Sequence, residues 1–168
     1  MNKSSVVVQV NHLKKWYWGL GMLFLIFLLD QISKYCILNI VNLPQKGSVP
    51  VIPFFNFTMV WNRAITFGML GQFGSWGSVI FSVSAFVIAA SLFIWMIRAR
   101  KIWVIMSLGA IVGGALGNIL DRLRFGAVVD FIHFHVAGWS WYVFNVADSA
   151  IVCGVIILLM DAFFGWEE

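Results

Sequence analysis

The chain has 168 residues, of which 61% are hydrophobic and 11% are charged, and its formal net charge is +4. Soluble domains average roughly 45–50% apolar and 25% charged residues, so this composition excludes an ordinary soluble domain and indicates a polytopic membrane protein of one domain. The basic residues are dispersed, which argues against a nucleic-acid partner. Cys36 and Cys153 lie in or beside different apolar runs without metal-ligand spacing, so we expect neither a disulfide framework nor a metal site.

The first apolar run predicts a membrane-spanning helix over residues 16–37, preceded by a polar tail at residues 1–15. The basic start is similar to that of a signal peptide, but no small-x-small cleavage site follows, so we expect this helix to be retained. A lipid-attachment site at Cys36 is disfavoured, because Lys34 and Tyr35 are the wrong residue types immediately before such a cysteine.

Residues 38–75 differ in character, since they hold all three prolines of the chain. This segment cannot form a spanning helix. Within it, residues 55–62 alternate between apolar and more polar side chains and end at Asn62, the period-2 pattern of a strand. Because lipid does not tolerate an open sheet edge, we expect this strand at or above the membrane interface, paired with neighbours or resting on the helices. Residues 71–77 are rich in glycine and serine and precede the next helix.

Three further spans are predicted over residues 76–97, 102–120 and 141–160, with a second outer segment at 121–140. Four spans place both termini on one side of the membrane. That side and the short 98–101 turn carry six Lys and Arg residues against five on the other side, and their position beside the helix ends favours cytoplasmic termini. Glycine and alanine are dense from 109 to 117, as expected where membrane helices approach closely.

Helix rise places several polar side chains at one depth. At 1.5 Å per residue, Asp30 lies about 22 Å and Asp148 about 20 Å from the predicted cytoplasmic surface, while Asn118 and Asp121 lie at about 26 Å and about 30 Å. Asp130 follows in the outer segment directly above them. The sequence therefore predicts a polar layer near the outer face of the membrane.

The carboxylates of this layer fall into two groups, one with basic neighbours in sequence and one without. Asp30 and Asp121 have basic neighbours, so they can form structural ion pairs, Asp30 with Lys34 and Asp121 with Arg122 or Arg124. Asp130 and Asp148 have no Lys or Arg within four positions. Unpaired carboxylates near lipid are candidates for function.

Two neighbouring carboxylates cannot both ionise easily, so the pair shares one proton. One member can then take a proton from water while the other donates one to the scissile group, which is the chemistry of aspartic proteases and needs no metal or other cofactor. Competing hydrolytic sets are absent: Ser75 lacks a nearby base, His12 lies in the tail, and His133 and His135 have no cysteine or acidic partner at ligand spacing.

Five separate motifs then carry a family resemblance. They are Asp30-Gln31-Ile32-Ser33-Lys34, Asn62 with Phe67-Gly68, Gly113-Gly114-Ala115-Leu116-Gly117-Asn118 with Asp121-Arg122, Val128-Val129-Asp130-Phe131, and Phe144-Asn145-Val146-Ala147-Asp148-Ser149. Their order and intervals resemble those of the lipoprotein signal peptidase family, the bacterial signal peptidase II enzymes. One departure lies at residues 63–66, where Arg-Ala-Ile-Thr replaces the family's usual x-Gly-Ala-Ala.

The resemblance implies a membrane all-α fold, with a four-transmembrane-helix bundle, a small periplasmic β-cradle and a short periplasmic helix, forming a single peptidase domain over residues 1–168. It implies an aspartyl endopeptidase of the bacterial inner membrane that cleaves prolipoproteins on the N-terminal side of a diacylglyceryl-modified cysteine. Asp130 and Asp148 match the catalytic dyad. Positions that bind substrate or support the pocket match Asp30, Lys34, Asn62, Asn118, Asp121, Arg122 and Asn145.

The implied partners are a lipidated prolipoprotein and membrane lipid, and peptide-like inhibitors of the family are candidate ligands. Two other classes stay open from the residues alone. A small proton-coupled transporter would use Asp148 and Asp30 as a relay, but it would need ionisable groups near mid-membrane and a path to both sides, whereas the predicted polar layer lies on one side only. A non-catalytic assembly subunit would tolerate replacement of both aspartates.

Overall fold

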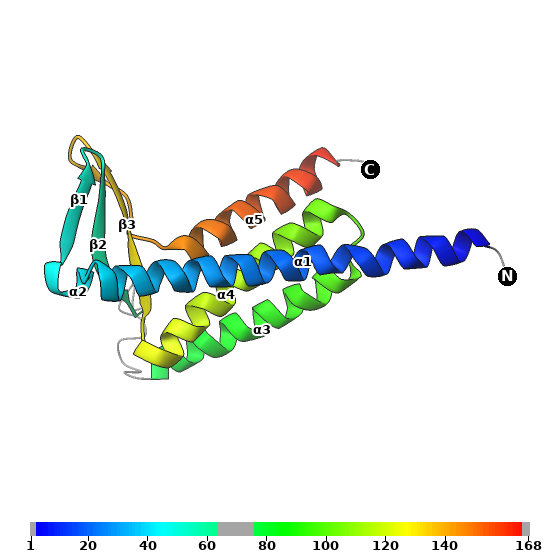
Figure 1. Ribbon diagram of the computed structural model, residues 1–168, viewed down its shortest axis with the longest axis horizontal. Helices are drawn as coiled ribbons and strands as arrows, with labels where there is room; N and C mark the ends of the chain where they lie inside the picture. Colours follow the sequence, from blue (N-terminus) through cyan, green and yellow to red (C-terminus); the bar gives the residue numbers. More distant parts are fainter. Residues whose placement is uncertain (1–2, 64–75, 166–168) are drawn as a thin grey trace.

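The computed structural model describes residues 3–63 and 76–165 and consists of long helices with a small sheet at one end (Figure 1). The long helices are α1 (Lys3–Tyr35), α3 (Trp76–Arg98), α4 (Ile102–Phe125) and α5 (Val146–Phe164). A π-helical turn, η1 (Cys36–Ile40), continues α1, and the short helix α2 (Leu43–Lys46) follows it. In this part of the chain four helical segments are long and apolar enough to cross a membrane, namely Lys15–Ile40, Val79–Arg98, Ile102–Phe125 and Val146–Phe164.

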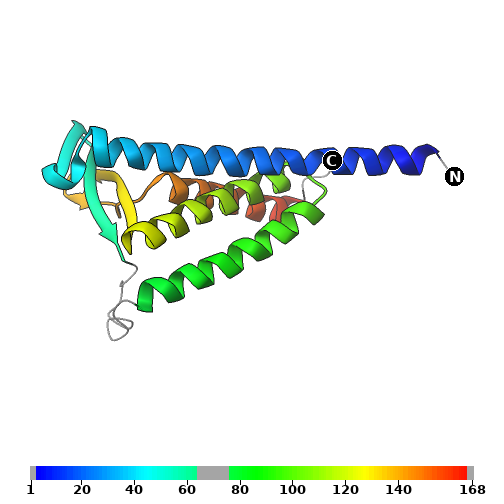
Figure 2. The same ribbon diagram turned by 60° about the horizontal axis from the view of Figure 1, so that its bottom comes forward.

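Helix α4 is the centre of the bundle, because it packs against α1, α3 and α5 (Figure 2). Its glycines permit this packing. A Cβ atom at Gly109 would collide with the backbone carbonyl of Gly19, and one at Gly113 would collide with that of Leu23. The expected close approach of helices at the glycine-rich stretch is therefore confirmed, and it brings polar residues of α1 and α4 into direct contact.

The sheet lies across the end of the bundle that is remote from both termini (Figure 1). Its antiparallel strands are β1 (Ser48–Ile52), β2 (Phe55–Asn62), β3 (Val128–Val136) and β4 (Trp139–Ser140), in the order β1-β2-β3-β4. Strand β2 has the bounds expected from the alternating pattern. Buried Ile37, Leu43, Val129 and Phe131 form a core in which β3 packs against η1 and α2, the segments that follow α1.

Some boundaries differ from the sequence-based ones. Helix α1 begins at Lys3, so most of the expected polar tail is helical. Helix α4 continues to Phe125, and Asp121 and Arg122 thus belong to its last turns instead of the outer segment. Helix α5 begins at Val146 and not near residue 141, because Asn145 caps it and Phe144 bridges back to Ile132 of β3. Residues 64–75, which include most of the 63–66 loop and most of the glycine- and serine-rich stretch at 71–77, lie outside the described residues, so the implied short periplasmic helix is not tested there.

Candidate active site

The polar residues singled out in the sequence meet where the helix bundle joins the sheet. Helix α1 brings Asp30 and Lys34, β2 brings Asn62, α4 brings Asn118, Asp121 and Arg122, β3 brings Asp130, and the start of α5 brings Asn145 and Asp148. The predicted polar layer therefore exists as one connected cluster. It lies beside the junction of β3 and α5, which Figure 1 shows at the end of the bundle that carries the sheet.

Asp130 lies on β3 and is almost completely buried, with 1% of its surface exposed. One carboxylate oxygen accepts a hydrogen bond from Asn145 Nδ2 at 2.6 Å, and the other accepts one from Asn62 Nδ2 at 2.9 Å. Burial, followed by the nearby charge of Asp148, raises the pKa of Asp130 to about 6, although the amide donors of Asn62 and Asn145 and the charge of Lys34 act in the opposite direction. Asp130 therefore holds its proton more strongly than an ordinary aspartate does.

Asp148 occupies the first turn of α5, in a capping box with Asn145. The backbone N–H of Asp148 donates to Asn145 Oδ1 at 2.9 Å, and the backbone N–H of Asn145 donates to Asp148 Oδ2 at 3.2 Å. Asn118 Nδ2 donates to the remaining oxygen, Oδ1, at 2.8 Å. Asn145 thus contacts both aspartates at once, and Asp148, unlike Asp130, is only partly buried.

A buried ionic cluster lies behind this pair. Lys34 Nζ lies 2.8 Å from Asp30 Oδ2 and 2.7 Å from Asp121 Oδ2. Each of these carboxylates also accepts a backbone hydrogen bond, Asp30 from Ala147 of α5 at 3.0 Å and Asp121 from Val129 of β3 at 3.1 Å. The two carboxylates therefore fix the elements that carry Asp148 and Asp130.

One expected ion pair is confirmed and another is wrong. Asp30 pairs with Lys34, as the i,i+4 spacing predicted. Asp121 pairs with Lys34 and not with Arg122 or Arg124, because its carboxylate faces the Lys34 ammonium on α1. Arg122 instead donates to the backbone oxygen of Asn118 at 3.3 Å, and the negative charges of Asp148, Asp130 and Asp121 stabilise its guanidinium.

Gln31 is a member of the cluster that the sequence reasoning missed. Its Nε2 donates to Asp30 Oδ2 and to Asp121 Oδ1, both at 3.1 Å, and so links α1 to α4. The available signal was its position beside Asp30 within an apolar helix, where a polar side chain needs a partner. Among the described residues, no group of three or more His, Cys, Asp or Glu side chains could hold a metal ion.

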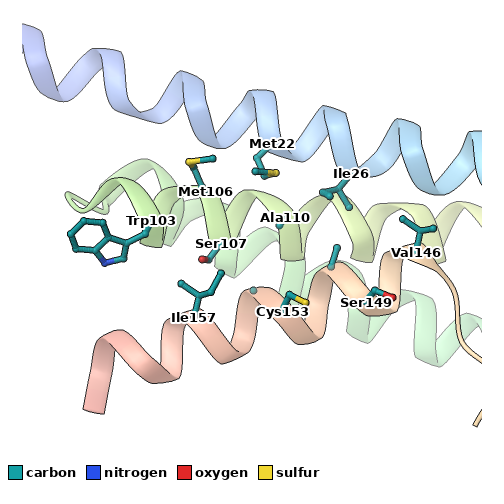
Figure 3. A pocket seen from close by; sticks show the side chains of 12 residues that line it. Met22, Ile26, Trp103, Met106, Ser107, Ala110, Val146, Ser149, Cys153 and Ile157 are labelled. Atoms are coloured by element: carbon teal, nitrogen blue, oxygen red, sulfur yellow. The ribbon is translucent and has the colours of Figure 1, made fainter. Parts of the chain in front are cut away.

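Two cavities lie near the site, and one of them opens onto Asp130. A cavity of about 660 Å³ opens onto Asp130 and Asn62, and its other lining residues are Val60, Trp61, Arg63, His133, Ser140, Trp141, Tyr142 and Val143. A second one, of about 520 Å³, lies between α1, α4 and α5 and is lined almost entirely by apolar side chains such as Met22, Met106 and Ile157 (Figure 3). Of these two, the first combines apolar walls with the buried carboxylate of Asp130, so it is the candidate substrate pocket.

Comparison with known proteins identifies the family of this chain. Residues 22–164 match the family model described as Signal peptidase (SPase) II. The chain belongs to the signal peptidase II family. A lipoprotein signal peptidase of Methylobacterium sp. (strain 4-46) is 43% identical over 150 residues, covering 89% of this chain and 90% of that protein. One from Coxiella burnetii (strain Dugway 5J108-111) is 42% identical over 149 residues, covering 88% and 90%.

Solved structures agree with this family membership. A bacterial membrane enzyme determined by the in meso method at 1.9 Å resolution is 28% identical, with a TM-score of 0.73, over 86% of this chain and 92% of that chain. A second, at 2.3 Å resolution, is 30% identical, with a TM-score of 0.71, over 89% and 92%. Membership of a protease family and four apolar helices together make this chain a multi-pass membrane protease.

Proposed function

We propose that the chain is an aspartyl endopeptidase that removes the signal peptide of a diacylglyceryl-modified prolipoprotein, on the N-terminal side of the lipidated cysteine. The observation that carries this proposal is the position of Asn145, which hydrogen-bonds to both Asp130 and Asp148 beside an open cavity. The reaction takes place at the periplasmic face of the bacterial inner membrane, with residues 1–168 acting as one peptidase domain.

The two aspartates have different roles in this proposal. Asp130, with its pKa raised to about 6 by burial, carries the shared proton. Asp148 is partly exposed and acts as the base that takes a proton from water. The water oxygen attacks the scissile carbonyl carbon while Asp130 donates its proton to the carbonyl oxygen. Collapse of the tetrahedral intermediate breaks the C–N bond, the leaving nitrogen takes a proton from Asp148, and Asp130 regains its own.

Lipid on the substrate explains how the peptide bond reaches the dyad. The acyl chains stay in the bilayer, and their binding free energy positions the scissile bond at the polar layer. The walls of the cavity suit such a substrate, since Trp61, Trp141 and Tyr142 lie around the opening to Asp130. Peptide-like inhibitors of the family would compete for the same space.

The test is cleavage of a purified prolipoprotein, followed by gel shift, with and without prior lipidation. We expect Asp130→Asn and Asp148→Asn each to lower kcat by at least about 1,000-fold, the combined loss expected when general acid–base chemistry and transition-state stabilisation fail. Asp161→Asn is the matched control, because Asp161 pairs with Lys101 at the other end of α5. It should cleave at the wild-type rate.

Full turnover by either dyad variant would overturn the aspartyl mechanism. Proton flux into liposomes without any peptide cleavage would instead favour a proton-coupled transporter. Equal cleavage of lipidated and unlipidated substrate would contradict the role given to the acyl chains.

A further inference from the structure

Lys34 is a buried cation whose ammonium group has two charged partners and one neutral partner. Its side chain is 3% exposed, within a helix that spans the membrane, where a charge must be compensated. Asp30 and Asp121 supply that compensation. The third partner of the ammonium is a neutral group, the side-chain oxygen of Asn118 at 3.1 Å. This contact adds no charge, but it gives the third N–H of the ammonium an acceptor and at the same time holds the side-chain oxygen of Asn118 in place.

Asn118 has an amide that can face in only one direction. Its oxygen accepts hydrogen bonds from two donors, Lys34 Nζ and Asn145 Nδ2, each at 3.1 Å. Its nitrogen consequently faces Asp148 and donates to Oδ1 at 2.8 Å. A rotated amide would direct its oxygen at the Asp148 carboxylate and its nitrogen at two donors, so every hydrogen bond would be lost.

The same oxygen also aligns the second asparagine of the site. Asn145 Nδ2 donates to Asn118 Oδ1 and to Asp130 Oδ1 at 2.6 Å. One oxygen atom, held by Lys34, therefore fixes the donor on Asp148 and the donor on Asp130 together. A three-donor ammonium suits this position, because it meets two carboxylates and one amide oxygen in three different directions.

We infer that Lys34 is a positioning residue for hydrolysis, acting through the Asn118 amide to hold one hydrogen-bond donor on each aspartate of the dyad. This inference rests on the proposed function. It assigns to a residue of α1, which does not line the substrate pocket, control over the geometry of Asp130 and Asp148.

A double-mutant cycle separates this role from a general structural one. We expect Lys34→Met to lower kcat by about 100-fold, the effect of a misplaced reacting group, while KM stays within about twofold. Asn118→Ala should cause a similar loss. Because both changes remove the same oriented amide, the double variant should lose no more than Asn118→Ala alone, whereas independent effects would multiply.

Lys101→Met is the matched control, because it also removes a lysine from an ion pair, at the far end of the bundle, and should keep wild-type kcat. Lys34→Met leaves the buried carboxylates of Asp30 and Asp121 without their cation. A second variant, Lys34→Met with Asp121→Asn, keeps the net charge of the cluster at its wild-type value and is measured alongside. The new Asn side-chain oxygen can still accept from Val129, and we expect the same loss of kcat.

Multiplicative losses in the cycle, or wild-type kcat in either Lys34 variant, would overturn the inference. Failure of both Lys34 variants to insert and fold would also overturn it, because Lys34 would then serve the fold itself. Wild-type protein in the same assay keeps the two proposals apart. If it does not cleave the lipidated prolipoprotein, the proposed function fails, whereas normal cleavage by wild type and Lys34 variants alike refutes only the positioning role.

Discussion

Opposing effects set the pKa of Asp130. Both of its oxygens accept amide N–H groups, from Asn62 and Asn145, and these donors stabilise the carboxylate form. Burial and Asp148 act more strongly in the other direction, and the resulting pKa of about 6 lies between that of a free aspartate and neutrality. A group with this pKa can give up its proton and take it back near physiological pH.

The pH profile tests this balance. If Asp130 is the acid of the dyad, kcat/KM should fall as pH rises through about 6, because the free enzyme then loses the proton that it must donate. Asn62→Ala removes a donor that lowers the pKa of Asp130, so the descending limb should move to higher pH. Initial cleavage rates between pH 4.5 and about 8.5 measure both effects. A limb that stays in place in Asn62→Ala, or moves to lower pH, would remove Asp130 from the acid role.

At the scale of the element, the same residues in and just before the first turn of α5 cap the helix and hold the two aspartates together. Asn145 satisfies the backbone N–H of Asp148 and so caps the helix, and its Nδ2 reaches across to Asp130 on β3. Asn118 and Asp30 contact the same turn from α4 and α1. The start of this helix is therefore fixed by three other elements.

Substitutions at Asn145 can separate these two roles. Serine caps helices about as well as asparagine but has no Nδ2, so Asn145→Ser keeps the cap and loses only the donor to Asp130 and Asn118. Its kcat should still fall by about 100-fold, because Asp130 loses an aligned donor. Asn145→Ala loses the cap as well, so it should lose activity and have a free energy of unfolding about 1 kcal/mol below that of Asn145→Ser. Thermal unfolding in detergent measures the stability of both variants, and cleavage rates measure their activity. Wild-type activity in Asn145→Ser would show that the cap alone matters.

Sequence patterns predicted those elements whose signal is local. The alternation of residues 55–62 gave the bounds of β2, and apolar runs located all four long helices. The end of α4 and the start of α5 were placed several residues off, since they depend on the glycine cap at Gly126 and on the contact of Phe144 with β3. Hydropathy alone carries neither kind of information.

The site divides in the same way. Depth along the helices was enough to place Asp30, Asn118 and Asp148 in one layer. It could not tell which residue pairs with Asp121, because that depends on the rotation of α4 against α1, which Gly109 and Gly113 set by close backbone contact. The partners of Gln31 depend on the same rotation, so its position in an apolar helix signalled only that it needs a partner.

At the scale of the whole molecule, a short basic turn marks the end of the bundle opposite the sheet. The end opposite the sheet holds Arg98, Arg100 and Lys101, with Lys15 donating to the carbonyl of Arg100 at 3.3 Å. Asp161 closes α5 there by accepting from Lys101 at 2.8 Å and from Trp103 at 3.0 Å. Short basic turns beside membrane helices stay in the cytoplasm, so the dyad and the sheet should face the periplasm.

Cysteine labelling tests this orientation. In a background of Cys36→Ala and Cys153→Ala, Gln45→Cys places a thiol on the exposed α2 at the sheet end, and Phe164→Cys places one at the opposite end, where Phe164 is 71% exposed. A membrane-impermeant maleimide should label Gln45→Cys in cells with a permeable outer membrane and an intact inner membrane. It should label Phe164→Cys only after the inner membrane is opened. The reverse pattern would place the dyad in the cytoplasm, where it could not act on a lipoprotein precursor at the periplasmic face.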